Sequence, residues 1–143
     1  MMMVPLYTAE INGHSLRFFK NPDGTQDMPW HAFYDLLMLT NHSSREAQQM
    51  LAAARVGPFK AKIRTIATSE GPVVIAPHWA AQGMIGAMLE IGRITPDIEA
   101  AYVKAGAHVI GLMVAHLPPV LRAETAIAMA RVSAEAGEAM RTS

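Results

Sequence analysis

The sequence has no cysteine and no net charge, with 12 basic residues against 12 acidic ones. The absence of cysteine excludes disulfide bonds, thiolate-rich metal sites and catalysis by a thiol. It is typical of a reducing compartment, so we expect a cytoplasmic protein, with a cysteine-free secreted protein as the alternative. Because the charges cancel, no overall field attracts nucleic acid, and any such binding must come from a local basic patch.

Long hydrophobic runs are also missing. The first ten residues lack the basic segment and the long apolar core of a signal peptide. The least charged run, residues 105–121, is short for a membrane span and is broken by Pro118-Pro119. We therefore expect a buried helix there and no membrane partner. One helical stripe is predicted to be buried, and His108 and His116 are expected to lie on it: Ile98, Ala101, Tyr102, Ala105, Val109, Leu112, Met113 and His116.

With 143 residues, of which 51% are hydrophobic, the chain is expected to fold as a single domain, residues 1–143. The composition changes near Ile94, where mixed strand and helix patterns give way to helical ones. We predict an α+β fold in which two small β-hairpins pack with short helices and an all-helical C-terminal arm follows. Residues 1–93 would form the α+β core, and residues 94–143 a helical extension that is a candidate dimerisation arm, so we expect a homodimer.

Turn residues indicate where in the sequence the two predicted hairpins lie. Residues 6–11 and 15–20 are strand-like and flank Asn12-Gly13, a strong hairpin signal. In the second hairpin, apolar and basic residues alternate over residues 59–66, with Phe59 on the apolar side. A turn at residues 69–72 and a β-branched strand at residues 73–75 follow.

Helices are predicted from caps, proline breaks and apolar spacing, over residues 30–39, 45–55, 78–89, 96–117 and 120–137. Asp27 or Met28 would cap the first helix, and Ser43 or Ser44 the second. Gly83 and Gly86 inside the third helix indicate that another element packs closely against it.

Basic residues gather within twenty positions, opposed only by Glu46: Arg45, Arg55, Lys60, Lys62 and Arg64. If the second helix and the second hairpin are neighbours, these side chains could form one patch that contacts several phosphates. The alternative is that they form the solvated outer face of an amphipathic hairpin.

The sequence contains no recognisable set of catalytic residues. Its six histidines include no pair at metal-binding spacing, and we expect neither a metal site nor a cofactor. No nucleophile elbow, phosphate-binding glycine loop or carboxylate pair is found. His31, in Pro-Trp-His, and His78, in Pro-His-Trp, could each line a ligand cleft or pack at a helix start. An enzyme that uses His31 or His78 is one hypothesis, although neither shows an oriented partner.

Two stretches, EINGHSLRFF…MPWHAFYDLLML and TIATSEGPVVIAPHWAAQGMIGAM, follow the order of a hairpin, a helix, a strand–turn–strand unit and a second helix. This order over residues 7–89 resembles the Bro-N domain of phage antirepressors and baculovirus Bro proteins. That family usually has an acidic or asparagine residue before its last helix, where this chain has Ala76-Pro77. The resemblance implies a DNA-binding module of a phage or another mobile element, with the C-terminal helices in place of a second domain.

The main functional hypothesis is therefore a DNA-binding regulatory protein of phage or mobile-element type. The five basic residues would contact the phosphates of double-stranded DNA, and a dimer would set the spacing of half-sites. The alternative is a small inhibitor or interaction module that binds a host nuclease or defence complex without catalysis. Zero net charge and the apolar helical arm motivate this alternative.

Overall fold

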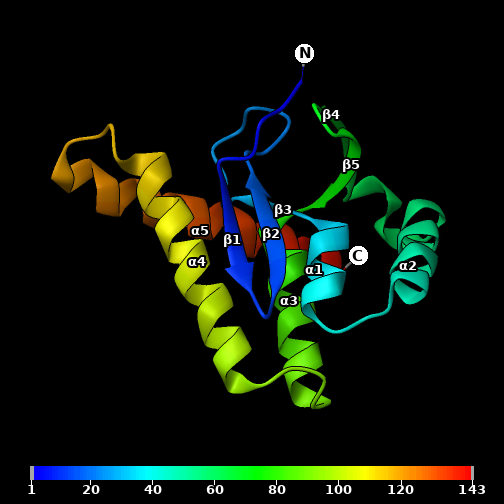
Figure 1. Cartoon of the computed structure of the whole chain (residues 1–143). Coiled ribbons are helices and arrows are strands. Elements are labelled where there is room, and N and C mark those ends of the chain that lie inside the picture. Colours follow the sequence, from blue (N-terminus) through cyan, green and yellow to red (C-terminus); the bar gives the residue numbers. More distant parts are fainter. Residues whose placement is uncertain (1, 143) are drawn as a thin grey trace.

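The computed structural model describes residues 2–142, without the side chains of Phe59 and Thr142. It confirms the α+β class: one antiparallel sheet is accompanied by helices and followed by a helical C-terminal region (Figure 1). The sheet has five strands in the order β1-β2-β3-β5-β4. Their bounds are β1 Tyr7–Ile11, β2 His14–Phe19, β3 Trp30–Ala32, β4 Arg64–Thr68 and β5 Gly71–Ala76.

The helices of the described chain are α1 Phe33–Leu39, α2 Ser44–Val56, α3 His78–Glu90, α4 Pro96–Val114 and α5 Pro119–Thr142, with a short 3₁₀ helix, η1, at Pro58–Ala61. Three of them, α2, α3 and α4, begin and end near the predicted residues, whereas α1 begins three residues later than predicted and α5 continues past its predicted end at Gly137. Ser43 caps α2: its hydroxyl accepts the Glu46 N–H, and the Glu46 carboxylate accepts the Ser43 N–H. This reciprocal pair satisfies backbone donors that a helix start would otherwise leave free. No helix of residues 2–142 combines the length and apolar character needed to cross a bilayer.

The first hairpin forms as predicted. Asn12 and Gly13 have φ values of 54° and 74°, the positive angles that a tight hairpin turn requires. Strands β1 and β2 pair from Tyr7 with Phe18 to Ile11 with His14. This register places Leu16 and Phe18 in the main core.

The predicted helix over residues 30–39 is wrong in its first part, because Trp30–Ala32 is a strand. His31 pairs with Phe18 on one side and with Ala76 on the other, so β3 joins the two hairpins into one sheet. All three residues of β3 are buried, and neighbouring strands supply the backbone partners that buried amides require. Asp27 does not cap a helix; its carboxylate accepts the Trp30 indole N–H at 3.1 Å.

The second hairpin is shorter at its start than predicted, because β4 begins only at Arg64. After the C-terminal end of α2, the Lys60 N–H donates to the Gly57 carbonyl at 3.1 Å and the chain turns through η1. Lys60 and Lys62 therefore precede the strand and do not alternate along it. The side chain of Phe59, predicted on the apolar face, lies outside the described part of the chain.

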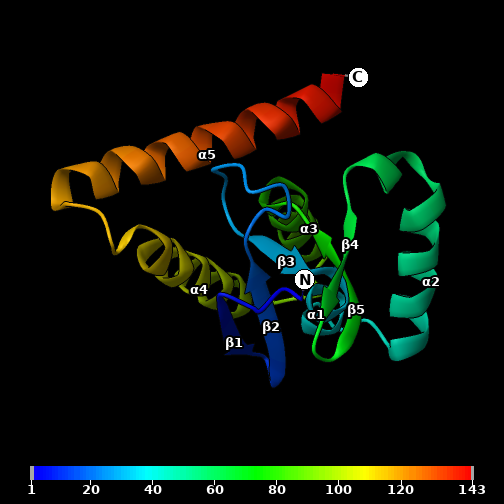
Figure 2. The same ribbon diagram turned by 90° about the horizontal axis from the view of Figure 1, so that it is seen from above.

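The helix α4 packs directly on the sheet and on α3, as its place beside β1 and α3 in Figure 1 indicates. Tyr102, Ala105 and Val109 are buried in the same cluster as Leu16 and Phe18. Figure 2 shows α5 lying across the molecule, and it packs against α3 and α4. The region from residue 94 thus contributes to the main core.

The prediction that His108 and His116 are buried is wrong, since both side chains are exposed. The core side of α4 is the one that carries Tyr102 and Val109. The His108 ring instead contacts the Tyr7 ring, with centroids 4.6 Å apart. Hydrophobic spacing therefore predicted the buried side of α4 correctly through Tyr102, Ala105 and Val109, and was wrong in adding the two histidines to it.

Candidate functional site

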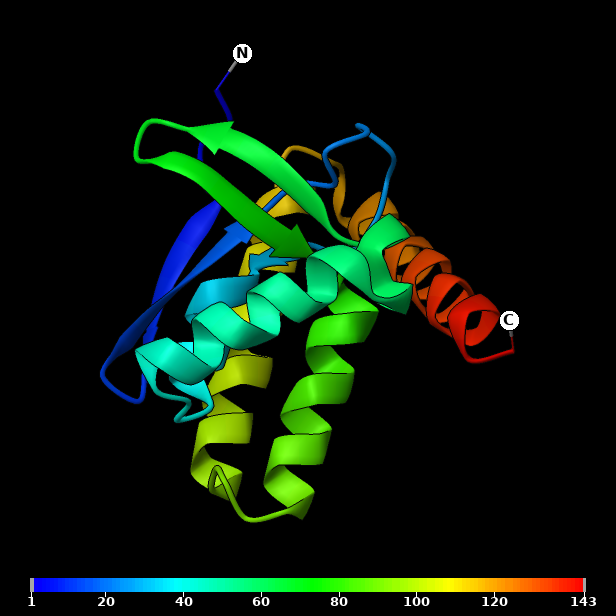
Figure 3. The ribbon, with the colours of Figure 1, turned by 90° about the vertical axis from the view of Figure 1, so that its right-hand side faces the viewer.

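Three of the predicted basic residues lie in one short segment that runs from the end of α2 through η1 towards β4. Arg55, Lys60 and Lys62 are all exposed and fall within eight positions. Figure 3 shows α2, η1 and β4 following one another on this side of the molecule, with α5 beyond them. We call Arg55, Lys60 and Lys62 the basic segment.

These cations have no partner in the part of the chain that the structure describes. The side chains of Arg55, Lys60 and Lys62, and also that of Arg45, make no hydrogen bond or ion pair within residues 2–142. The sequence has no acidic residue between Glu46 and Glu70. A surface cation that has no partner within the protein is available to pair with an external anion such as a phosphate.

Arg45 lies apart from the basic segment. It is the second residue of α2, whereas Arg55 is the last but one. Ten residues of α-helix separate two positions by ~15 Å along the axis. Arg45 is instead close in sequence to the Ser43–Glu46 cap, so it is a separate positive charge at the other end of the helix.

Arg64 is already paired. Its guanidinium donates to the Asp23 carboxylate at 2.6 Å, and both side chains are about half exposed. A pair of this kind contributes ~0–1 kcal/mol, so an incoming phosphate can compete with the carboxylate. Arg55, Lys60 and Lys62 thus lie in one exposed segment of the chain, whereas Arg45 lies at the other end of α2 and Arg64 is held in an ion pair.

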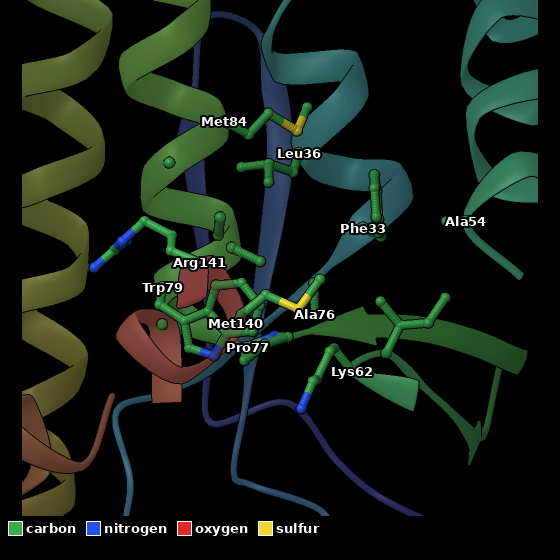
Figure 4. A pocket seen from close by; sticks show the side chains of 15 residues that line it. Phe33, Leu36, Ala54, Lys62, Ala76, Pro77, Trp79, Met84, Met140 and Arg141 are labelled. Carbon is green, nitrogen blue, oxygen red and sulfur yellow. The ribbon is translucent and has the colours of Figure 1, made fainter. Parts of the chain in front are cut away.

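A cavity of about 540 Å³ opens next to Lys62. Figure 4 shows its lining of 15 residues, which come from α1, α2, the segment before β4, β5, α3 and the C-terminal end of α5. The large apolar side chains include Phe33, Trp79, Met84 and Met140. The sequence did not predict this pocket, because no local pattern marks a lining drawn from so many elements.

The glycine Gly83 of α3 faces this cavity. A Cβ placed on Gly83 would meet no atom within 4 Å, and the same holds for Gly86. The prediction that another element packs closely against these two glycines is therefore wrong. The close approach is made by Gly137 of α5, where a Cβ would lie 3.1 Å from that of Trp79.

His31 and His78, which the sequence singled out separately, come together in the fold, with ring centroids 5.8 Å apart. Nε2 of His31 forms a hydrogen bond of 3.0 Å with the Tyr102 hydroxyl. Burial, and to a smaller extent the neighbouring His78, lower the pKa of His31 to about 3. His31 is therefore a neutral core residue at ordinary pH.

His78, unlike His31, lines a cavity. Burial also lowers the pKa of His78, while the charge of Asp27 opposes this shift. A second cavity, of about 540 Å³ between α3 and α5, is lined by His78, Gln82 and Ser133 among others, but not by His31. Among residues 2–142, no group of three or more histidine and carboxylate side chains could hold a metal ion. The arrangement offers two neutral imidazoles, of which only His78 lines the cavity.

Comparison with known proteins does not add to this picture: no family model, no curated protein and no solved structure matches the chain.

Proposed function

We propose that the protein binds double-stranded DNA as a regulatory protein of phage or mobile-element type, with the basic segment as its principal phosphate contact. The observation that carries the proposal is the group of unpaired cations Arg55, Lys60 and Lys62, in a stretch without acidic residues. Each phosphate that such a group neutralises releases condensed counterions, so binding would be local, electrostatic and dependent on salt. Arg45 and Arg64 would contribute contacts at the flanks.

The order of the helices and strands also supports this proposal. Residues 7–89 run through a hairpin, helices, a second hairpin and α3, the order that a Bro-N-like module implies. One architecture serves many functions, and function depends on the residues that the fold displays. The cations therefore carry the proposal, and the absence of cysteine favours a reducing cytoplasm as its location.

The proposal includes a homodimer. Large apolar side chains are exposed near the turn between α4 and α5, among them Leu112, Val120, Leu121 and Ile127. Exposed apolar groups of this kind favour self-association, and a symmetric dimer is its commonest form. Light scattering that finds only monomer at high micromolar concentration would contradict this part of the proposal.

Fluorescence anisotropy of a labelled duplex at two salt concentrations tests DNA binding. The variant Lys60→Glu/Lys62→Glu should bind far more weakly, and the slope of log K against log salt should shrink by ~0.9 for each phosphate that the variant no longer neutralises. Lys104→Glu/Arg131→Glu is the matched control, because it changes the net charge equally at exposed residues of α4 and α5. The control should retain a salt slope close to that of the original protein.

Two results would overturn the proposal: no duplex binding at low salt, or equal reductions of affinity in the two double variants. In either case, a pull-down from nuclease-treated bacterial lysate tests the alternative of a protein-binding inhibitor. Recovery of one stoichiometric protein partner would support that alternative.

A further inference from the structure

The pocket beside Lys62 has the dimensions of a small-molecule site. Its volume of about 540 Å³ lies within the ~300–1,000 Å³ typical of ligand pockets. Phe33 of α1, Trp79 and Met84 of α3 and Met140 of α5 surround it, as Figure 4 shows. Such a lining favours a ligand with an apolar body, and methionine side chains adapt to irregular shapes.

The charged side chains among the described residues that line the pocket are all positive. Among the described residues that line the pocket, Lys62 and Arg141 are the charged ones, and none is a carboxylate. Arg141 pairs with Glu138 on its own helix at 2.9 Å, whereas Lys62 makes no ion pair or hydrogen bond within residues 2–142. An unpaired ammonium beside an apolar surface favours a ligand that ends in an anionic group.

We propose that this pocket binds a small amphipathic carboxylate of the fatty-acid class. The apolar chain lies between α1, α3 and the C-terminal end of α5, and the carboxylate pairs with Lys62. Binding removes the apolar surface of Trp79 and Met140 from water and links α5 to the rest of the fold. This site does not depend on DNA binding, although Lys62 belongs to both surfaces.

Titration calorimetry of the full chain with decanoate, below its micelle concentration, tests the site. Decanoate should bind saturably, and about tenfold more tightly than the uncharged decan-1-ol. The variant Gly83→Leu places a side chain in the open space over α3 and should weaken decanoate binding by about tenfold or more.

Gly86→Leu is the matched control, because the same change is made on the same helix at a glycine that does not line the pocket. Both substitutions raise helix propensity, so both variants should fold. Decanoate affinity in Gly86→Leu should stay within about twofold of the original. Lys62→Met should remove the preference for decanoate over decan-1-ol while leaving the alcohol bound.

A second measurement does not depend on any glycine variant folding. Trp79 lines the pocket, so 2-bromodecanoate should quench tryptophan fluorescence, and Trp79→Phe should reduce that quenching. Each of three results would overturn the proposal: no saturable binding of decanoate, equal affinities for the acid and the alcohol, or equal reductions of affinity in the two glycine variants. Duplex binding by Gly83→Leu should be unchanged, because Gly83 does not belong to the basic segment. The DNA-binding proposal can therefore hold even if the pocket proposal fails.

Discussion

The Tyr102 hydroxyl lies 3.0 Å from Nε2 of His31, and this buried hydrogen bond joins α4 to the middle strand of the sheet. The two residues are seventy-one positions apart in the sequence. Burial raises the pKa of Tyr102 and lowers that of His31 to about 3, so both side chains are uncharged over the physiological range. The C-terminal helices are thus connected to the α+β core by a polar contact as well as by packing.

The stability of the fold should decrease as the pH falls below about 6.5. An unfolded chain protonates His31 near pH ~6.5, whereas the folded chain resists protonation until about pH 3. The stabilisation is therefore complete above the unfolded pKa and is lost as the pH falls towards 3, with a slope of up to ~1.4 kcal/mol per pH unit for one proton. Urea unfolding at several pH values measures this slope.

The variant His31→Phe/Tyr102→Phe removes the titrating group and its partner together. Its unfolding free energy should vary less between pH 6 and pH 4, because only His78 remains as a buried imidazole of this pair. His116→Gln is the control, since His116 is exposed, and it should retain the original slope. Equal slopes in the original protein and in the double variant would contradict the assignment to His31.

Releasing Arg64 should strengthen DNA binding. In Asp23→Asn, the carboxylate that accepts from Arg64 is removed, so the guanidinium becomes available to phosphate. The duplex affinity at low salt should rise by about threefold, the scale of one exposed ion pair. Anisotropy of the same labelled duplex measures this change. Asp97→Asn, at the exposed start of α4, removes an equal charge and should have a smaller effect; equal effects would show that Arg64 does not touch the DNA.

Arg17 and Asp35 should be strongly coupled in stability. Asp35 accepts from the Arg17 backbone N–H at 3.0 Å, from Nε at 2.8 Å and from Nη2 at 3.0 Å, which connects α1 to β2. Removing the Asp35 carboxylate leaves the charge of Arg17 without its partner, so Asp35→Ala should lower the free energy of unfolding by about 3 kcal/mol. Arg17→Met/Asp35→Leu should cost less than the sum of the single changes in urea unfolding. Additive costs would mean that the pair contributes little.

An alanine at Gly137 should stabilise the fold less than an alanine at an unobstructed helical glycine. A Cβ at this position would lie 3.1 Å from Cβ and 3.3 Å from Cγ of Trp79, so Gly137→Ala requires α5 and Trp79 to move apart by a few tenths of an ångström. Gly111→Ala in α4 meets no atom within 4 Å and should stabilise by roughly 0.5–1 kcal/mol through helix propensity alone. Thermal unfolding, together with limited proteolysis of α5, distinguishes the two. Equal stabilisation by both alanines would contradict close packing of α5 on α3.

The basic residues of the candidate site were found from the sequence, but their arrangement was not. Arg55, Lys60 and Lys62 are close in the chain, at the end of α2, in η1 and just after it. The pairing of Arg64 with Asp23 joins residues forty-one positions apart, and no local pattern indicates it. The pocket was missed for the same reason, since α1, α3 and α5 each contribute only part of its lining.

The sequence by itself determined the α+β class and the local signals: the turn at Asn12-Gly13, a serine cap for α2 at residue 43 or 44 and a helix that begins at residue 96. These features depend on backbone angles and hydrogen bonds between residues a few positions apart. Only the tertiary structure decided that Trp30–Ala32 forms a strand, that His108 and His116 are exposed and where the pocket opens. Each of these depends on partners distant in the chain, and the free energy of burying them together outweighs local preference.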